Sequence, residues 1–339
     1  MFLTNFTKNY KIKKRLILKK SDKKNHKKAF SLIELSIVIV IVSILITGAL
    51  SVSVNAINNS KTKVTKERLS EIYKALGNYV VVNKKLPCPA PVTDIKSTTS
   101  TYGTAASTSL CASTSGVSIS GSSTNLARGM LPVKTLGLPY DMAEDGFGDK
   151  FEYIVDKNHT VASTGAASDF GTATTANITI YEKPGSATAQ TIETAAAFAI
   201  VGFGGNKYGA YGFDSATRNT LPTDTQEAFN APSSSSDNTT YTNSFYVSSG
   251  NSDVFDDVVF YKTRNTLVSD FNALSIIPCA SANETLYGTT ITWPLAWYDQ
   301  IAVSSTSCPA GYTSGVTKPT KRCTAFGSWD VVINPCLAP

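Results

Sequence analysis

The sequence predicts an α+β protein in which a long N-terminal helix packs on an antiparallel β-sheet and a small disulfide-rich β module follows. Three observations lead to this fold class. A helix-forming stretch runs from Phe30 to about Asn83, first apolar and then amphipathic. Short runs rich in β-branched and aromatic residues recur between residues 151 and 261. Four of the six cysteines lie after residue 271.

The first segment, residues 1–29, is a basic leader with eleven Lys and Arg and a single acid. Residues 30–51 follow as an apolar, β-branched segment whose only charge is Glu34, and we expect a transmembrane helix there. The 21 residues from Phe30 to Leu50 are enough to span a bilayer core about 30 Å thick. Because positive flanks stay in the cytoplasm, the sequence predicts a single-pass protein with N-in, C-out topology.

The junction between leader and helix reads KKAFSLIEL at residues 27–35. It resembles the processing site of type IV prepilins and type II secretion pseudopilins. The resemblance implies that a prepilin peptidase cuts between Ala29 and Phe30, methylates the new Phe30 amine and leaves Glu34 as the fifth residue. The family usually has Gly where this chain has Ala29, which is also small. It further implies a pilin-like lollipop shape, other pilin or pseudopilin subunits as partners, and an assembly platform in the inner membrane.

Glu34 is the one residue of the apolar segment that needs a partner, because a carboxylate in hydrocarbon costs about 2.5–3.5 kcal/mol even on forgiving scales. Cleavage would create a cation at the Phe30 amine, about 6 Å away along the helix axis at 1.5 Å per residue, or closer on a neighbouring subunit. Glu34 would then set the register of assembly. The alternative is a plain signal anchor with an interfacial Glu near the helix start, where the helix dipole tolerates it.

The chain after the leader has 20 basic and 24 acidic side chains, a net charge of −4, so nucleic-acid binding is not expected. All six cysteines follow the apolar segment, which predicts disulfides in an oxidising compartment. The only histidines are His26 and His159, and no zinc-ligand spacing is present. With one imidazole left after the leader, the usual catalytic triads cannot form, and the sequence predicts no enzyme.

Residues 52–84 continue the helix in amphipathic form. Apolar side chains recur three and four residues apart and form one stripe: Leu69, Ile72, Leu76 and Val80. This stripe predicts packing on a globular domain. Pro87 and Pro89 should end the helix.

Residues 85–270 form the predicted globular domain. A Ser, Thr, Gly and Ala rich stretch at 93–125 reads as a long loop. Cys88 and Cys111 bracket part of it, and pairing them would close a loop of about 24 residues, contributing roughly 3–3.5 kcal/mol. The strand-like runs are Phe151–Val155, Ile178–Glu182, Ala197–Phe203 and Val254–Tyr261. Segments at 86–90 (LPCPA), 129–132 (GMLP) and 145–148 (DGFG) resemble a group of prepilin-type proteins that carry LPCPA after the long helix.

Residues 271–339 form the predicted disulfide-rich module. Its cysteines come with CPAGY at 308–312, GSW at 327–329 and PC at 335–336, an order that is similar to a sushi (complement control) module. The resemblance implies two disulfides, Cys279 with Cys323 and Cys308 with Cys336, and a single Trp, Trp329, buried between them. The alternative is a tail that is crosslinked only for rigidity.

Four carboxylates lie close together around two glycines and are candidate oxygen ligands for calcium outside the cell: Asp141, Glu144, Asp145 and Asp149. No EF-hand spacing is present, and solvated turn carboxylates are the commoner explanation. No other cofactor is expected.

Two further charged groups are not expected to be sites. The acidic group is expected to mark a strand end or a surface ion pair, and it consists of Asp253, Asp256 and Asp257. The basic group is expected to be a solvated face, and it consists of Lys318, Lys321 and Arg322.

Together these features predict a membrane-anchored, pilin-like subunit of a type IV pilus or a type II secretion pseudopilus. Its globular part would be periplasmic or on an extracellular filament. That part exceeds 250 residues, which favours a minor or tip subunit over a major subunit. The alternative is an uncleaved, membrane-anchored surface binding protein, or adhesin, that uses the C-terminal module. The sequence does not identify a tip ligand.

Overall fold

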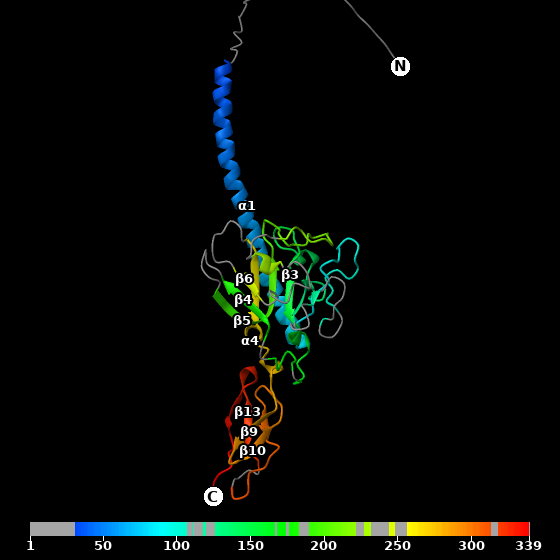
Figure 1. Cartoon of the computed structure of the whole chain (residues 1–339), viewed down its shortest axis with the longest axis vertical. Coiled ribbons are helices and arrows are strands. Elements are labelled where there is room, and N and C mark those ends of the chain that lie inside the picture. Colours follow the sequence, from blue (N-terminus) through cyan, green and yellow to red (C-terminus); the bar gives the residue numbers. More distant parts are fainter. Residues whose placement is uncertain are drawn as a thin grey trace, which may run out of the picture. The chain divides into compact units, whose positions relative to one another are not determined.

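The computed structural model describes residues 31–106, 111, 118–119, 126–166, 168–173, 176–182, 190–221, 227–231, 244–247, 256–312 and 318–338. The leader and the cleavage position at Ala29 and Phe30 lie outside these residues. The chain divides into two compact units, Met1–Val54 and Asn55–Pro339. Helix α1 (Leu32–Asn83) contributes to both (Figure 1).

The first unit consists, where it is described, of the start of α1. The Ile33 N–H donates to Ser31 Oγ at 3.3 Å, and the Ser31 N–H donates to Glu34 Oε2 at 3.0 Å. This reciprocal pair is a capping-box arrangement, which satisfies two N–H groups that the helix itself cannot pair. Among the described residues, no helix combines the length and the apolar character that crossing a membrane requires. The predicted span at 30–51 extends beyond the residues whose side chains are described.

In the second unit, α1 packs on the globular domain through the predicted stripe. All four stripe residues are buried: Leu69, Ile72, Leu76 and Val80. The helix ends at Asn83, as predicted, but Lys84 rather than a proline terminates it. Lys84 adopts a left-handed conformation with φ +56°, and its N–H donates to the Val80 carbonyl at 2.8 Å.

Where the chain is described, seven strands form one sheet in the order β1-β2-β3-β5-β4-β6, and β7 also pairs with β5 (Figure 1). Their bounds are β1 Ser118–Ile119, β2 Leu126–Met130, β3 Glu152–Asp156, β4 Ile178–Glu182, β5 Gln190–Gly202, β6 Ser244–Val247 and β7 Val258–Thr263. The pairs are antiparallel, as predicted, except that β4 and β6 run parallel. A parallel pair needs a long connection between its strands, which local sequence patterns do not reveal.

Strand β5 is the centre of the sheet. Its first half pairs with β4, and its second half lies between β3 and β7, with Ile200 opposite Tyr153 and Phe260. The side chains of β5 alternate between two cores. Phe198 and Ile200 face the larger core, which contains the α1 stripe, whereas Ala199 and Val201 belong to a second core on the opposite side. Both faces of β5 are therefore buried at this point.

Short helices complete the domain: α2 Glu227–Asn230, α4 Arg264–Asp270, and the 3-10 turns η2 Tyr140–Ala143, η3 Lys157–Thr160 and η4 Leu274–Ile276. Residues after 271 still belong to this domain, because Ile276 and Ile277 are buried in its larger core. The predicted boundary at 270/271 therefore moves to about residue 278. Cys88 and Cys111 form a disulfide across part of the predicted loop.

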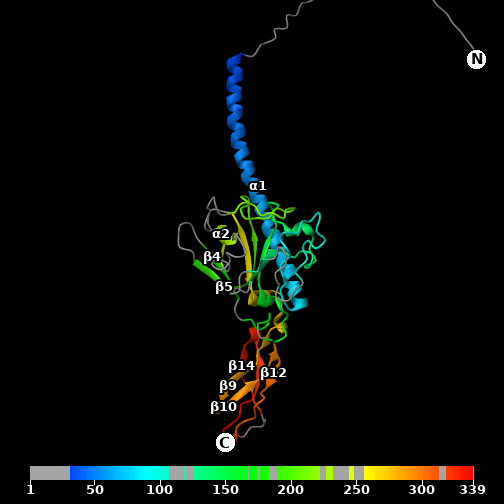
Figure 2. The ribbon, with the colours of Figure 1, turned by 45° about the vertical axis from the view of Figure 1, so that its right-hand side comes forward.

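The C-terminal module contains strands β8 Pro278–Cys279, β9 Ala282–Leu286, β10 Thr289–Trp293, β11 Ala296–Trp297, β12 Ile301–Val303, β13 Thr320–Cys323 and β14 Trp329–Val332, with the turn η5 Ala325–Gly327 (Figure 2). They form the pairs β9–β10 and β8–β11 and the three-stranded sheet β12-β13-β14. Disulfides join Cys279 to Cys323 and Cys308 to Cys336, the pairs that the sushi resemblance implies.

The expectation that Trp329 is the single buried tryptophan of the module is wrong. Trp293 is the buried one, 1 % exposed, and its indole N–H donates to Glu284 at 3.0 Å. Trp329 is half-buried and packs beside Trp293, with ring centroids 6.4 Å apart. Trp293 lies within the β9–β10 hairpin, where neighbouring side chains enclose it and supply a partner for its N–H.

Candidate functional site

The candidate assembly site is the start of α1. Every described side chain from residue 31 to residue 47 is exposed, including a continuous set of Ile, Leu and Val. The hydroxyl groups in this stretch are satisfied locally: Ser36 donates to the Ile33 carbonyl at 2.8 Å, and Ser43 donates to the Ile39 carbonyl at 2.7 Å. Such back-bonding removes the need for water around a hydroxyl. The described surface of this stretch is therefore suited to an apolar environment.

Glu34 is the only ionisable residue of this surface. Among the described residues, only one of its carboxylate oxygens accepts a hydrogen bond, from the Ser31 N–H, so the carboxylate keeps capacity for a cationic partner. The capping role of Ser31 escaped the sequence argument, although the S-x-x-E pattern at residues 31–34 was a signal that could have revealed it.

The four calcium candidates are not brought together into one site. Asp141 is exposed and lies 3.7 Å from Arg68, and Asp149 is buried and lies 3.0 Å from Lys207. The Asp145 side chain bonds to the backbone of its own loop, where Oδ1 accepts hydrogen bonds from the N–H groups of Phe147 at 2.8 Å and Asp149 at 3.1 Å. Among the described residues, no three of these four carboxylates place their ligand atoms close enough together to hold a metal ion, and the calcium set stays a prediction.

Burial dominates the electrostatics of this loop. Desolvation raises the pKa of Asp145 to about 6, although the backbone hydrogen bonds that its carboxylate accepts oppose the shift. Desolvation also raises the pKa of Asp149, although the Lys207 ammonium stabilises the ionised carboxylate and opposes this shift.

The loop that contains residues 144–146 forms hydrogen bonds with α1. The Gly146 N–H donates to Thr65 Oγ1 at 2.9 Å, and Arg68 donates to the carbonyls of Glu144 and Asp145 at 2.8 and 3.1 Å. A Cβ atom on Gly146 would lie 2.0 Å from the Lys61 carbonyl oxygen. The glycine is thus required by the close approach of two backbones.

A different group of carboxylates does converge. Among the described residues, Glu227, Asp256 and Asp257 place ligand atoms within 4.8 Å of one another. Asp256 Oδ2 accepts the backbone N–H groups of Gly205 at 2.7 Å and Asn206 at 2.9 Å. Burial raises the pKa of Asp257 well above its usual range. Oxygen ligands of this kind suit a hard cation such as Ca²⁺.

The sequence could not find this group because Glu227 comes from α2, far from the two aspartates in the chain. Asp253, the third member of the predicted acidic trio, lies outside the described residues. Asp256 and Asp257 directly precede β7, which confirms the strand-end prediction. The alternative of a surface ion pair is not what the structure shows for Asp257, which is buried and whose Oδ2 accepts a hydrogen bond from the Asn230 amide at 2.9 Å.

The basic trio of the module is not one patch. Lys321 is buried, lies 2.6 Å from Glu284, and places its ammonium 5.2 Å from the centre of the Trp293 ring. Arg322 is exposed and lies 3.5 Å from Asp299. Alternation along β13 sends these neighbours to opposite faces of the sheet.

The outer face of the β12-β13-β14 sheet is apolar around Arg322. Ile301 and Val303 are 53 % and 52 % exposed and flank the buried Ala302 on β12. Val331 on β14 is 76 % exposed.

Comparison with known proteins supports the N-terminal assignment. A family described as "Prokaryotic N-terminal methylation motif" matches residues 24–50. The match is consistent with a prepilin or pseudopilin-type protein and confirms the resemblance of the KKAFSLIEL junction. No curated protein and no solved structure matches the chain. The likenesses to the LPCPA group and to a sushi module remain predictions.

Proposed function

We propose that this chain is a minor or tip subunit of a type IV pilus or a type II secretion pseudopilus. It is cleaved before Phe30, anchored by its N-terminal helix and assembled through that helix. The observation that carries the proposal is the methylation motif at residues 24–50, which overlaps the start of α1, where the described apolar side chains are uncovered. A prepilin peptidase and other pilin subunits are the partners that the motif implies in general.

The proposed mechanism is assembly by helix packing. Before assembly the apolar part of α1 is held in the inner membrane, with the leader in the cytoplasm and the globular part outside. In the filament, the same surface packs against the helices of other subunits. Glu34 neutralises the methylated Phe30 amine of a neighbour, because opposite charges at close range favour each other's ionised forms. Local satisfaction of Ser36 and Ser43 supports both environments.

The minor or tip role rests on the size of the part after α1 and on its appended module. A module on every subunit of a shaft would place three-stranded sheets with exposed Ile301, Val303 and Val331 along the whole filament. Large exposed apolar patches mark interaction sites or aggregation liabilities. We propose that the chain has no catalytic role, because its one histidine after the leader, His159, is buried and no nucleophile is placed beside it in a described hydrogen bond.

The mass of the mature N-terminus tests the proposal. Protein is purified from cells that contain prepilin peptidase and from cells that lack it, and the N-terminal peptide is sequenced by mass spectrometry. A chain that begins at Phe30 with one methyl group supports the proposal. An intact leader in both strains contradicts it and favours the alternative, a surface binding protein whose specific support is the apolar face of the module.

Two substitutions at Glu34 separate the capping role from the register role. Glu34→Gln keeps a side-chain oxygen that can accept the Ser31 N–H, because Gln serves in capping boxes as Glu does, but it has no charge. Glu34→Ala removes both functions. If the charge sets the register, both variants insert in the membrane and neither enters sheared filaments. Normal incorporation of Glu34→Gln would show that only the cap matters.

A further inference from the structure

The three-stranded sheet β12-β13-β14 of the C-terminal module is covered on only one of its faces. On that side, the Lys321 ammonium of β13 lies 5.2 Å from the centre of the Trp293 ring, which belongs to β10. Ala302, which pairs with Lys321, is buried on the same side. Ile301 and Val303 alternate with Ala302 along β12 and are exposed. The sheet therefore has an inner face against the β9–β10 hairpin and an uncovered outer face.

The outer face is aliphatic around one charged side chain. Its members come from all three strands: Ile301 and Val303 on β12, Arg322 on β13 and Val331 on β14. The register places Ile301 directly opposite Arg322, and Val331 lies at the irregularity where β14 pairs with β13 on the other side. An apolar sheet face is normally buried against another layer, and exposed apolar groups that lie together mark interaction sites. The outer face thus lacks a second layer.

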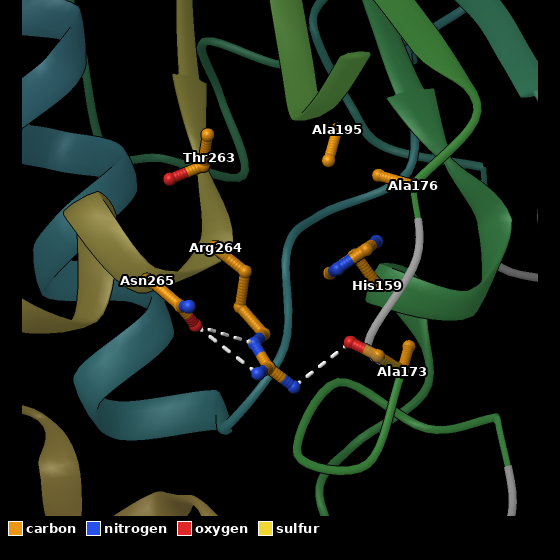
Figure 3. Close-up of a pocket in the computed structure, with 7 residues that line it drawn as sticks. All are labelled: His159, Ala173, Ala176, Ala195, Thr263, Arg264 and Asn265. Atoms are coloured by element: carbon orange, nitrogen blue, oxygen red, sulfur yellow. Dashed lines mark hydrogen bonds between the residues drawn. The ribbon is translucent and has the colours of Figure 1, made fainter. Parts of the chain in front are cut away.

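Arg322 keeps its hydrogen-bonding capacity for a partner. Among the described residues its guanidinium donates no hydrogen bond, and its ion pair is with Asp299, whose Oδ1 lies 3.5 Å from Nη1. Both side chains of this pair are exposed. By contrast, the buried Arg264 of the globular domain donates four hydrogen bonds to acceptors of its own domain, among them Ala173 and Asn265 (Figure 3). A guanidinium without such partners can bind a further carboxylate.

We propose that the outer face binds the same face of a second copy of this chain. The charges select this occupant, because one Arg322 and one Asp299 make the face neutral and complementary to itself. In a twofold pair, each Arg322 guanidinium bonds to the Asp299 carboxylate of the other copy. The aliphatic side chains of the two sheets then pack face to face as in a β-sandwich. A partner with one dominant charge would leave either Arg322 or Asp299 unmatched.

The proposal rests on the module and holds whether or not the chain enters a filament. Its test is sedimentation equilibrium of the full chain in a density-matched nonionic detergent, over a range of protein concentrations. The expected result is a dimer that dissociates on dilution, because the face is small compared with a stable interface. A wild-type chain that stays monomeric at every concentration overturns the proposal.

A matched pair of variants locates the contact. Val331→Asp places a charge on the outer face and should weaken the dimer about tenfold or more, because the new carboxylate would be buried without a partner. Val82→Asp is the control, because Val82 on α1 is 77 % exposed and Val331 is 76 % exposed. The control should dimerise as the wild type does. Equal association of Val331→Asp and the wild type overturns the proposal.

Exchange of the two charges tests the pairing with a second copy. Arg322→Asp and Asp299→Arg each place like charges against each other in their own dimers, and each should be monomeric where the wild type dimerises. In an equimolar mixture, every pair of one chain of each kind restores both ion pairs, so the dimer should return. If both variants keep the wild-type near-ultraviolet circular dichroism spectrum and their mixture stays monomeric, the pairing of Arg322 with Asp299 is wrong. Full dimerisation of each variant alone also overturns it.

Discussion

Gly146→Ala is the substitution for which the structure makes the sharpest prediction. Gly146 sits where the loop that follows Asp145 meets α1. The new methyl carbon would lie 2.0 Å from the carbonyl oxygen and 2.7 Å from the carbonyl carbon of Lys61. Both are backbone atoms of a helix, so neither can turn aside as a side chain would. The loop must move away from α1 instead.

The cost follows from what that movement breaks. Overpacking of this kind costs about 1–3 kcal/mol. Displacing the loop also stretches the Gly146–Thr65 hydrogen bond and the bonds from Arg68 to the loop carbonyls, each contributing about 0.5–1.5 kcal/mol. Replacing Gly by Ala returns about 0.4–1 kcal/mol through the unfolded chain. These terms together give a net loss of about 1.5–7 kcal/mol, depending on how far the three bonds are weakened, against the roughly 5–15 kcal/mol of a typical domain.

The assay is guanidinium unfolding of the full chain in detergent, followed by near-ultraviolet circular dichroism, with Gly148→Ala as the matched control. Gly148 has φ +85°, but a Cβ atom there would meet nothing within 4 Å, so only backbone strain of about 1–2 kcal/mol is expected. Thr65→Val removes the Gly146–Thr65 hydrogen bond and the bond from Thr65 to the Lys61 carbonyl but leaves the Arg68 bonds, so it should reproduce only part of this loss. Wild-type stability of Gly146→Ala, or a loss no greater than that of Gly148→Ala, would refute the argument from close backbone approach.

Three further predictions concern processing, pH and the module. Ala29→Leu should accumulate precursor that keeps the 29-residue leader on gels, and processing at the wild-type rate would place the cut elsewhere. The pKa of Asp145, about 6 when folded against an ordinary 3.8, means that the folded state holds its proton more tightly between these values. The contribution of Asp145 to the free energy of unfolding therefore falls as pH rises from about 4 to about 6 and stays low above that. In chemical denaturation at several pH values, Asp145→Asn should lose this pH-dependent fall in stability. An unchanged pH dependence of stability in Asp145→Asn would contradict the prediction. Deleting residues 278–339 should leave the globular domain folded and incorporated in filaments while removing any surface contact that the module makes. Deleting residues 275–339 also removes the buried Ile277 and should make the domain less resistant in a proteolysis assay. Equal protease resistance of the two deletion variants would contradict the boundary.

Much of the fold could be predicted from local patterns. The stripe of Leu69, Ile72, Leu76 and Val80 predicted the buried face of α1 because helical spacing alone places these residues on one side. The run Ile178–Glu182 coincides with β4, and β3 is displaced by one residue from its prediction. Strand β5 begins seven residues before the predicted Ala197, because its first half is polar and exposed and takes its conformation from pairing with β4.

The sites were predicted less completely than the fold. The methylation motif could be read directly, because a peptidase recognises a linear segment and the motif is contiguous. The calcium candidates are also close together in the sequence, but one carboxylate oxygen of Asp145 accepts hydrogen bonds from backbone N–H groups of its own turn. The carboxylates that do converge include Glu227, which is far from Asp256 and Asp257 in the sequence. This group therefore has no local sequence signal.

The sequence by itself determined the basic leader, the apolar helix with its single carboxylate, the amphipathic continuation and the number of cysteines available for crosslinking. These are properties of neighbours along the chain, governed by helical spacing, charge and residue type. The tertiary structure alone decided where the domain ends, which tryptophan of the module is buried, and which polar groups remain unmatched inside. Those outcomes depend on contacts between residues far apart in sequence, such as Gly146 with Lys61 and Ile277 with the core of the domain, and only the folded chain brings such residues together.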